Sequence, residues 1–161
     1  MIELLILDID GTLADISHRE HLIERDNPDW DEFNNPDLVA LDDPIPEALE
    51  ALLDLLSEVS EVVLLTGRPE SLRSTTIDWL EEHFDLVIGE ETEGALVSDL
   101  IMRPDDEIIE APIFKKSVIE EDIIPIYEEF VAVDDNDDVI AALEEFGEVY
   151  KAPDFWEEIS S

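Results

Sequence analysis

The residues with the clearest chemical pattern in this sequence are Asp8 and Asp10, which directly follow an apolar run. On an extended chain, residues two apart point to the same side, so both carboxylates face one way while Ile9 faces the other. Asp8 can then attack a phosphorus atom, and Asp10 can protonate the leaving oxygen and later deprotonate a water. Gly11 allows the sharp turn that brings backbone amides toward a phosphate. Asp pairs after strands also cap turns, but the whole string of residues 4–13 is more specific.

A second polar group follows the apolar run Val62–Leu65. The Thr66 hydroxyl could donate to a phosphoryl oxygen or cap the following helix, and Arg68 could add a bidentate contact to the same phosphate. The neighbouring Gly67 is a further predicted substrate contact, as is Thr12 in the first string. This part of the chain is therefore predicted to bind phosphate.

Paired acids, Asp134 and Asp135, end a third apolar run, Val131–Val133. Ligands bind beyond the carboxyl ends of parallel strands, so the three segments should deliver their polar residues to one rim. A carboxylate nucleophile repels a phosphate dianion and needs a cation, and Mg²⁺ takes hard oxygen ligands. We predict that Mg²⁺ is held by Asp8, the backbone carbonyl of Asp10 and Asp134, and that Asp135 is a ligand through water or orients Lys115. In so acidic a chain, a solvated surface pair is the alternative interpretation of the last two.

Charge is the unusual feature of the composition. The chain has 46 acidic residues and 8 basic ones, with a formal net charge of −38. Self-repulsion on this scale destabilises a compact state unless salt screens it, and the Debye length falls to about 3 Å at 1 M salt. Because the acids are spread along the whole chain, we interpret the composition as halophile-like. A surface that mimics nucleic acid or binds basic partners is the alternative.

In so acidic a chain, each lysine or arginine is expected to have a specific local role. Two of the three lysines, Lys115 and Lys116, lie together at the start of a predicted helix. Either ammonium could neutralise phosphate charge as the nucleophile approaches. The ordinary alternative is a lysine that faces solvent.

Apolar patterning predicts strands that alternate with helices. Strands are expected at Ile2–Leu7, Glu61–Thr66, Leu86–Ile88, Leu100–Met102, Glu128–Val133 and Val149–Lys151. Helices are expected from Pro46 onward and at Glu70–His83, Phe114–Ile123 and Val139–Phe146. The mostly polar residues 14–44 are expected to form a helical turn or two and an irregular flap. This order predicts a three-layer α/β/α fold, with helices on both faces of a central parallel sheet.

Size and composition are typical of one domain, and we expect residues 1–161 to form it. Apolar residues make up 45 % of the chain, a globular value. There are no cysteines, which excludes disulfides and thiolate metal sites. The sequence has no apolar run long enough to cross a bilayer and no signal-peptide pattern, so the expected location is cytoplasmic. No obligate protein partner is indicated.

Four segments together resemble the motifs of the haloacid dehalogenase superfamily. The first is the string of residues 4–13, the second ends at Thr66, the third is a single lysine, and the fourth ends at Asp134 and Asp135. The resemblance implies a Rossmann-like fold with no large cap domain, and hence an open active site. It also implies a Mg²⁺-dependent phosphomonoesterase that forms an aspartyl-phosphate. The catalytic residues would be Asp8, Asp10, Thr66 and the lysine.

The chain also resembles the 3′-phosphatase domain of bacteriophage-type polynucleotide kinase/phosphatase. The matching parts are Arg19, nine residues beyond Asp10, then Thr66–Glu70, Leu100–Arg103, a lysine twelve residues after Arg103, Asp134–Asn136 and Ala152–Phe155. That lysine spacing favours Lys115 over Lys116. The resemblance implies substrate contacts from Arg19, Arg68 and Arg103, and a nucleotide or a polynucleotide 3′-phosphate end as substrate.

The sequence departs from this family between Arg103 and Lys115, where positive charge is lost. Nucleic-acid affinity normally depends on cationic phosphate contacts, and this chain has few. A small-metabolite ester such as a sugar phosphate is therefore an alternative substrate, and a non-catalytic acidic binding protein on the same fold is a second alternative. His18 is either a substrate contact or a structural residue. The chain lacks a Gly-rich loop ending in Lys-Ser/Thr, so kinase activity is not expected.

Overall fold

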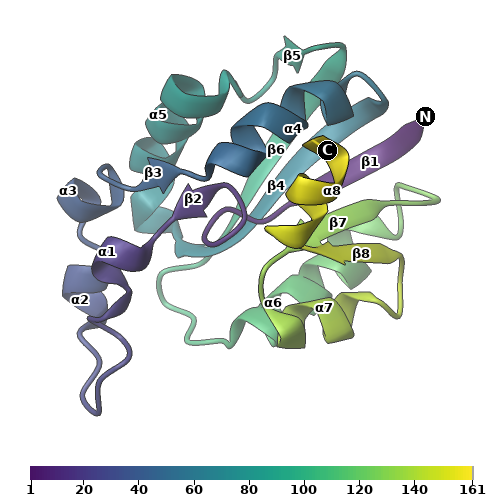
Figure 1. Cartoon of the computed structure of the whole chain (residues 1–161). Helices are drawn as coiled ribbons and strands as arrows, with labels where there is room; N and C mark the ends of the chain where they lie inside the picture. Colours follow the sequence, from purple (N-terminus) through teal and green to yellow (C-terminus); the bar gives the residue numbers. More distant parts are fainter. Residues whose placement is uncertain (161) are drawn as a thin grey trace.

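The computed structural model describes residues 1–160, and a six-stranded sheet forms its centre. The strand order is β5-β6-β4-β1-β7-β8 (Figure 1). All neighbouring strands are parallel except β5, which pairs antiparallel with β6 at one edge. The strands are β1 (Ile2–Leu7), β4 (Val59–Pro69), β5 (Glu91–Thr92), β6 (Ala95–Arg103), β7 (Val131–Asp134) and β8 (Glu148–Lys151). The predicted central parallel sheet is confirmed.

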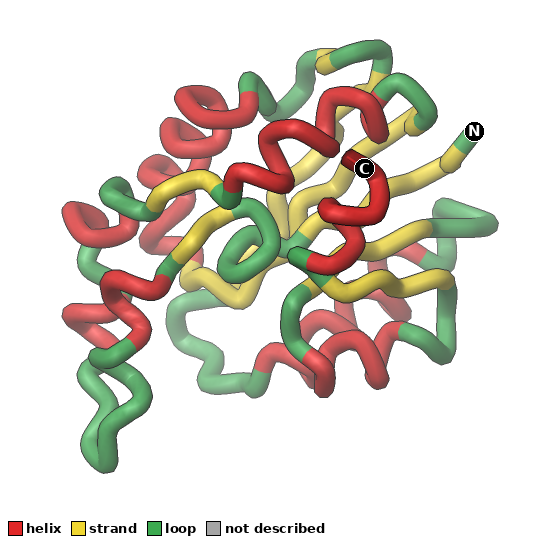
Figure 2. Tube along the Cα trace, in the orientation of Figure 1, coloured by secondary structure: helices red, strands yellow, loops and turns green. Residues whose placement is uncertain are grey.

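Strand β1 is buried on both of its faces. Leu5 and Leu7 belong to one apolar cluster, whereas Leu4 and Ile6 belong to another on the opposite side. Because side chains alternate along a strand, a continuous apolar run needs cover on both sides. One side is covered by α4 (Pro46–Leu56), α5 (Arg73–Phe84) and α8 (Asp154–Ser160). The other is covered by α6 (Ala111–Val118), the π-helical turn η2 (Ile119–Ile123) and α7 (Asp137–Leu143), which completes the three-layer fold (Figure 2).

The helices begin and end at ordinary sequence signals. Pro46 and Pro112 lie in the first turns of α4 and α6, where a proline sacrifices no helical hydrogen bond. The Asn136 side chain caps α7 by accepting the N–H groups of the second and third residues after it. A 3₁₀ turn, η1 (Glu70–Leu72), leads into α5, which ends at Asp85 in the left-handed conformation (φ 58°).

Residues 14–44 form a compact segment between β1 and α4. They contain β2 (Ala14–Asp15), α1 (Ser17–Glu20), α2 (Trp30–Phe33), α3 (Pro36–Val39) and β3 (Asp43–Pro44). The antiparallel pairing of β2 with β3 holds the two ends of the segment together. In Figure 1 the segment lies beyond the carboxyl end of β1, at the opposite end of that strand from the amino terminus. It is therefore placed beside the edge of the sheet where the polar residues gather.

Several parts of the chain differ from the sequence-based expectation. Strand β7 begins at Val131 rather than at Glu128, and β5 was not predicted. The strand predicted at Leu86–Ile88 is wrong, because Asp85 turns the chain and the Gly89 N–H donates to the Val97 carbonyl (2.7 Å). The strand predicted at Leu100–Met102 is the end of the longer β6. Helix α8 was not predicted. Within residues 1–160, no helix is long and apolar enough to cross a membrane.

Candidate active site

Asp8, Thr66 and Asp134 lie at the carboxyl ends of three adjacent strands, β1, β4 and β7. Asp8 directly follows β1, and its N–H donates to the Val133 carbonyl of β7 (3.1 Å). All three side chains are buried. The predicted strand ends therefore deliver their polar residues to the same edge of the sheet.

The Asp8 carboxylate is held by a partner on each oxygen. The Lys115 ammonium donates to Oδ1 (2.8 Å), and the Thr12 hydroxyl donates to Oδ2 (3.0 Å). Lys115 also donates to Asp134 Oδ2 (2.7 Å), so one cation joins two acids. Burial raises the pKa of Asp8 well above its usual value, and Lys115 offsets only part of the rise. Although burial opposes it, Asp8 and Asp134 raise the pKa of Lys115, which keeps the ammonium charged.

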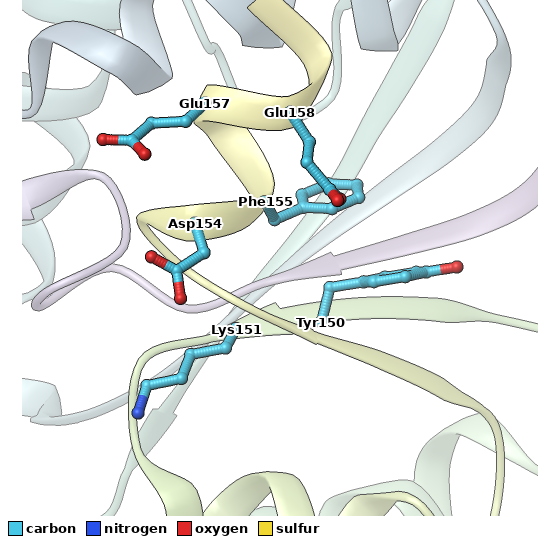
Figure 3. Close-up of a pocket in the computed structure, with 6 residues that line it drawn as sticks. All are labelled: Tyr150, Lys151, Asp154, Phe155, Glu157 and Glu158. Carbon is cyan, nitrogen blue, oxygen red and sulfur yellow. The ribbon is translucent and has the colours of Figure 1, made fainter.

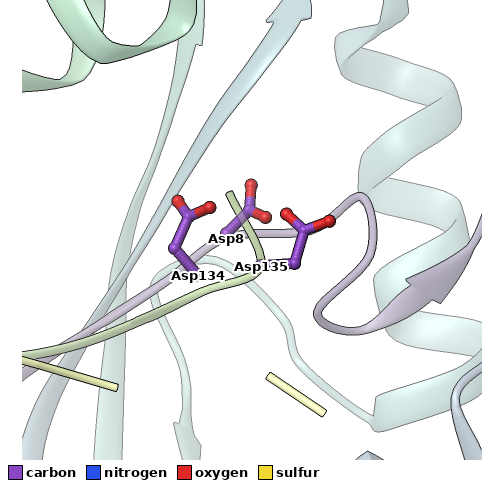
Figure 4. A group of neighbouring side chains, drawn as sticks. All are labelled: Asp8, Asp134 and Asp135. Carbon is purple, nitrogen blue, oxygen red and sulfur yellow. The ribbon is translucent and has the colours of Figure 1, made fainter. Parts of the chain in front are cut away.

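Asp8, Asp134 and Asp135 form a cluster of carboxylates whose potential ligand atoms all lie within 4.8 Å of one another. Figure 4 shows the three carboxylates pointing the same way from the ends of β1 and β7. Burial raises the pKa of Asp135 to about 6, and the charge of Asp134 adds to that rise. Three acids facing a single ammonium leave uncompensated negative charge, and their hard oxygens fit a divalent cation such as Mg²⁺. These residues could therefore hold a metal.

The loop after Asp8 needs its glycine for two reasons. Gly11 has φ +82°, and a Cβ there would lie 1.9 Å from Asp135 Oδ2. The loop closes on itself because the Gly11 N–H donates to the Ala14 carbonyl (2.8 Å). The loop is also held by helix α8, where the Trp156 indole N–H donates to the buried Thr12 carbonyl (2.9 Å). The loop is thus held both by its own backbone and by the far end of the chain.

Asp10 receives two arginines on one of its oxygens. Arg68 donates from Nε (2.9 Å) and Nη2 (2.7 Å) to Oδ1, and Arg19 Nη2 donates to the same atom (3.3 Å). Burial would raise the pKa of Asp10, but Arg68 and Arg19 outweigh it and hold that pKa below its usual value. Both arginines are almost fully buried. Their roles as substrate contacts remain predictions.

Asp42, a buried acid that both arginines contact, was not predicted from the sequence. Its side chain is fully buried and accepts from Arg19 (2.8 and 2.9 Å), from Arg68 (3.0 Å) and, where the ring nitrogen carries a proton, from His18 (2.6 Å). Asp42 is one acid among 46, and it follows no apolar strand. Asp42 is distinguished only by its contacts with Arg19 and Arg68, and these contacts exist only in the folded chain.

The remaining predicted residues have simpler surroundings. Thr66 Oγ1 accepts the N–H of Arg68 (3.1 Å), a local contact near the carboxyl end of β4. Arg103 donates to the Gly67 carbonyl (3.2 Å) and to carbonyls of its own loop, and so it supports backbone. Lys116 is 41 % exposed and pairs with Glu145 (3.4 Å), away from the carboxylate cluster. Of the two lysines, Lys115 is the one that contacts Asp8.

A separate hollow lies between β8 and α8. Tyr150 and Phe155 stack there (4.6 Å between ring centroids), beside Lys151 and Asp154 (Figure 3). Its other lining residues, Glu157 and Glu158, are also acidic. The Lys151 ammonium donates to Asp137 (2.8 Å), and none of the six lining residues is one of the predicted site residues.

Comparisons with known proteins agree with the fold. The model of the family described as "Polynucleotide kinase PNKP phosphatase domain" matches residues 3–149. No curated protein matches the chain. A chain in "Structure of the Pnkp1/Rnl/Hen1 RNA repair complex" is similar, with a TM-score of 0.64 and 19 % identity. The similarity covers 94 % of this chain and 42 % of that one, so this chain spans less than half of its length.

Two further solved structures have the same fold. A haloacid dehalogenase-like hydrolase, SP0104 from Streptococcus pneumoniae, has a TM-score of 0.54 and 14 % identity, over 89 % of this chain and 80 % of that one. D,D-heptose 1.7-bisphosphate phosphatase from B. bronchiseptica, complexed with magnesium and phosphate, has a TM-score of 0.51 and 16 % identity, over 93 % and 80 %. Since the family model covers most of the chain, the protein belongs to the PNKP-type phosphatase domains of the haloacid dehalogenase superfamily.

Proposed function

We propose that the protein is a Mg²⁺-dependent phosphomonoesterase that uses Asp8 as its nucleophile. The observation that carries the proposal is the setting of Asp8. Its carboxylate is buried at the end of β1, held by Lys115 and Thr12, and grouped with Asp134 and Asp135. A carboxylate fixed beside an ammonium and further hard oxygen ligands suits attack on a phosphate ester.

The reaction has two steps. In the first, an Asp8 oxygen forms a bond to phosphorus, the ester P–O bond breaks, and Asp10 in its protonated form gives a proton to the leaving oxygen. Because Arg68 and Arg19 lower the pKa of Asp10, only the small fraction of the protein that holds this proton reacts. In the second, Asp10 takes a proton from a water, whose oxygen forms a bond to phosphorus while the bond between phosphorus and the Asp8 oxygen breaks, which releases inorganic phosphate. Asp8 and the proton on Asp10 are thereby restored.

The groups around Asp8 would offset the negative charge of the phosphate and of the nucleophile in this scheme. Lys115 neutralises part of the negative charge as Asp8 approaches the phosphate, and the Thr66 hydroxyl donates to a phosphoryl oxygen. Mg²⁺, held by Asp8, Asp134, Asp135 and the Asp10 backbone carbonyl, would offset the repulsion between nucleophile and substrate. Thr12 fixes the rotamer of Asp8 through its hydroxyl (3.0 Å).

We propose a nucleotide or a polynucleotide 3′-phosphate end as the substrate. The match to the PNKP phosphatase family supports this choice. An open site without a large cap would admit a bulky ester, and Arg19, Arg68 and Arg103 would be the substrate contacts.

A small-metabolite ester is the second candidate, and a specific observation favours it. Arg19 and Arg68 are already bound to acids, and Arg103 is bound to carbonyl oxygens. The surface carries few other cations to bind a polynucleotide backbone, since the chain has only 8 basic residues.

Phosphate release in high salt with Mg²⁺ separates these candidates. A 3′-phosphorylated oligonucleotide, nucleoside monophosphates and sugar phosphates would be compared, with EDTA and Asp8→Asn as controls. Faster release from the oligonucleotide supports the first substrate class, whereas release confined to small esters supports the second. If Mg²⁺ and Asp8 make no difference to any ester, the proposed chemistry is wrong and a non-catalytic binding protein becomes the better explanation.

A further inference from the structure

The hollow between β8 and α8 begins at the same edge of the sheet as the carboxylate cluster. Lys151, at the carboxyl end of β8, pairs in register with Asp134 of β7, and the Ala152 N–H donates to the Asp134 carbonyl (3.0 Å). Neighbouring strands lie about 4.8 Å apart, so the end of β8 is two strand spacings, or about 10 Å, from the end of β1 that carries Asp8. The hollow is thus within reach of a ligand that extends from a phosphate at Asp8.

Two aromatic rings form one end of this hollow. The Tyr150 and Phe155 rings stack with 4.6 Å between their centroids and an interplanar angle of 20°. Because Tyr150 is 38 % exposed, part of this pair is open to a ligand. In Figure 3 the rings lie at one end of the hollow, and Lys151 and Asp154 lie at the other. The volume of about 570 Å³ is in the range of small-molecule sites.

The remaining lining adds hydrogen-bond acceptors to the rings. The carboxylates of Asp154 and Glu157 accept N–H groups and donate none when they are ionised. A flat heteroaromatic ring that carries amino groups fits both features, because it stacks on aromatic side chains and donates to carboxylates. We propose that the hollow is a subsite for a nucleobase of the substrate, which stacks on Tyr150 and Phe155. This inference rests on the proposed function.

An exposed cation lies between the carboxylate cluster and the rings. The Lys151 side chain is 48 % exposed, and its ammonium donates to Asp137 (2.8 Å). Exposed ion pairs of this kind contribute little, so a phosphate of the substrate can contact the ammonium in competition with Asp137. Arg19, Arg68 and Lys115 are instead buried and each is paired with two acids. Lys151 therefore suits the backbone of a nucleotide whose base enters the hollow.

Stacking suits a protein of this charge. With 8 basic residues and a net charge of −38, the chain gains little affinity from contacts with phosphates, and molar salt weakens such contacts further. Screening acts on charges, whereas the stacking of a base on a ring does not depend on net charge. A base subsite therefore explains how so acidic a protein can bind a nucleotide in high salt.

The test measures binding, so that it does not depend on turnover. Two 3′-phosphorylated trinucleotides with the same fluorophore and the same backbone charge would be compared, one with adenine bases and one without bases. Their Kd values would be measured by fluorescence anisotropy in molar KCl with EDTA. We expect the unmodified protein to bind the adenine oligonucleotide about 5- to 100-fold more tightly. In Tyr150→Leu the difference should fall below about threefold, because the ring is lost.

Tyr150→Phe is the matched control. It keeps the ring and removes only the hydroxyl, which donates to Glu148 (2.9 Å), so the preference for adenine should persist. Thermal unfolding would show whether Tyr150→Leu folds. If it does not, Tyr150→Thr replaces it, because threonine suits a strand and also lacks a ring.

Equal binding of the two oligonucleotides by the unmodified protein would overturn the proposal. A preference for adenine that survives without the Tyr150 ring would overturn it as well. Phosphate release from the adenine oligonucleotide with Mg²⁺ tests the proposed function separately. Release without any effect of the bases would leave the phosphatase and remove the subsite. A base preference that depends on Tyr150, without release from any ester, would keep the subsite and contradict the phosphatase.

Discussion

Much of the positive charge of this protein lies inside the candidate site. Arg19, Arg68 and Lys115 are three of only 8 basic residues, and all three are buried. Buried charges are tolerated when they are paired, and each of these cations contacts two acids. The site is therefore a set of interlocked ion pairs whose members depend on one another.

Lys115→Ala should lower the phosphatase rate by about 10²- to 10³-fold, since it removes the cation that offsets charge at the nucleophile. Lys116→Ala is the matched control, because its ammonium is exposed and pairs with Glu145. Steady-state kinetics with Mg²⁺ would compare the two. Equal losses in both variants would contradict the assignment of Lys115.

Gly11→Ala should weaken Mg²⁺ binding as well as stability. The new Cβ would lie 1.9 Å from Asp135 Oδ2 and would push that side chain out of the carboxylate cluster. Gly89→Ala has a similar φ of +90° but nothing within 4 Å, so it bears only the backbone strain of about 1 to 2 kcal/mol. The rise in Tm on adding Mg²⁺ should fall in the first variant and persist in the second. An unchanged rise in Gly11→Ala would show that Asp135 is not a ligand.

Sequence patterns could predict many of the site residues, but not Asp42, the buried acid that contacts Arg19 and Arg68. Asp8, Thr66 and Asp134 were placed correctly at one edge because each follows an apolar strand, and strand direction is set locally. Asp42 could not be anticipated, because its burial arises when residues 14–44 fold against Arg68. The choice of Lys115 came from a spacing within a family, and no local pattern distinguishes it from Lys116.

Secondary-structure elements were predictable where a regular apolar pattern continues over many residues. Strands β1 and β4 and helix α4 have such runs. The hairpin of β5 and β6 does not, because it depends on the left-handed residues Asp85, Glu93 and Gly94. Helix α8 has only seven residues, too few for a clear helical pattern. Its position follows from Trp156, which is fully buried in the core and donates to the Thr12 carbonyl.

Trp156→Phe should therefore lower stability and activity together. The change keeps an aromatic ring in the core but leaves the buried Thr12 carbonyl without its donor, at a cost of about 1 to 3 kcal/mol. Trp30→Phe is the control, because Trp30 is 56 % exposed. Urea unfolding would measure the first effect and kcat the second. A Trp156→Phe protein as stable and active as Trp30→Phe would mean that α8 does not support the loop.

Across the whole molecule most acids lie at the surface, whereas Arg19, Arg68 and Lys115 are buried with Asp8, Asp42 and Asp134. With a net charge of −38, repulsion acts across the entire surface, and it also acts on any incoming phosphate ester. Salt screens both interactions. Binding of an anionic substrate should therefore respond to salt in the opposite sense to an ordinary nucleic-acid-binding protein.

Raising KCl from 0.1 M to 2 M should increase Tm and also kcat/KM for the preferred ester, because the Debye length falls from about 10 Å to about 3 Å by 1 M. An uncharged osmolyte at equal osmolality would control for general stabilisation. Thermal unfolding and initial rates would be followed in both series. Full stability in dilute buffer, or rates that fall with KCl as they do for cationic binders, would contradict the halophile-like interpretation.

The hydrogen bond from Trp156 to Thr12 also bears on how the chain folds during translation. The Thr12 carbonyl finds its donor only after residue 156 has been synthesised. Lys115 likewise joins Asp8 to Asp134 only after residue 134 has emerged from the ribosome. The contacts that hold Asp8 and its loop are therefore completed by residues that are synthesised long after them. If Asp8 is the nucleophile, as proposed, its pocket forms only after those later residues have been added.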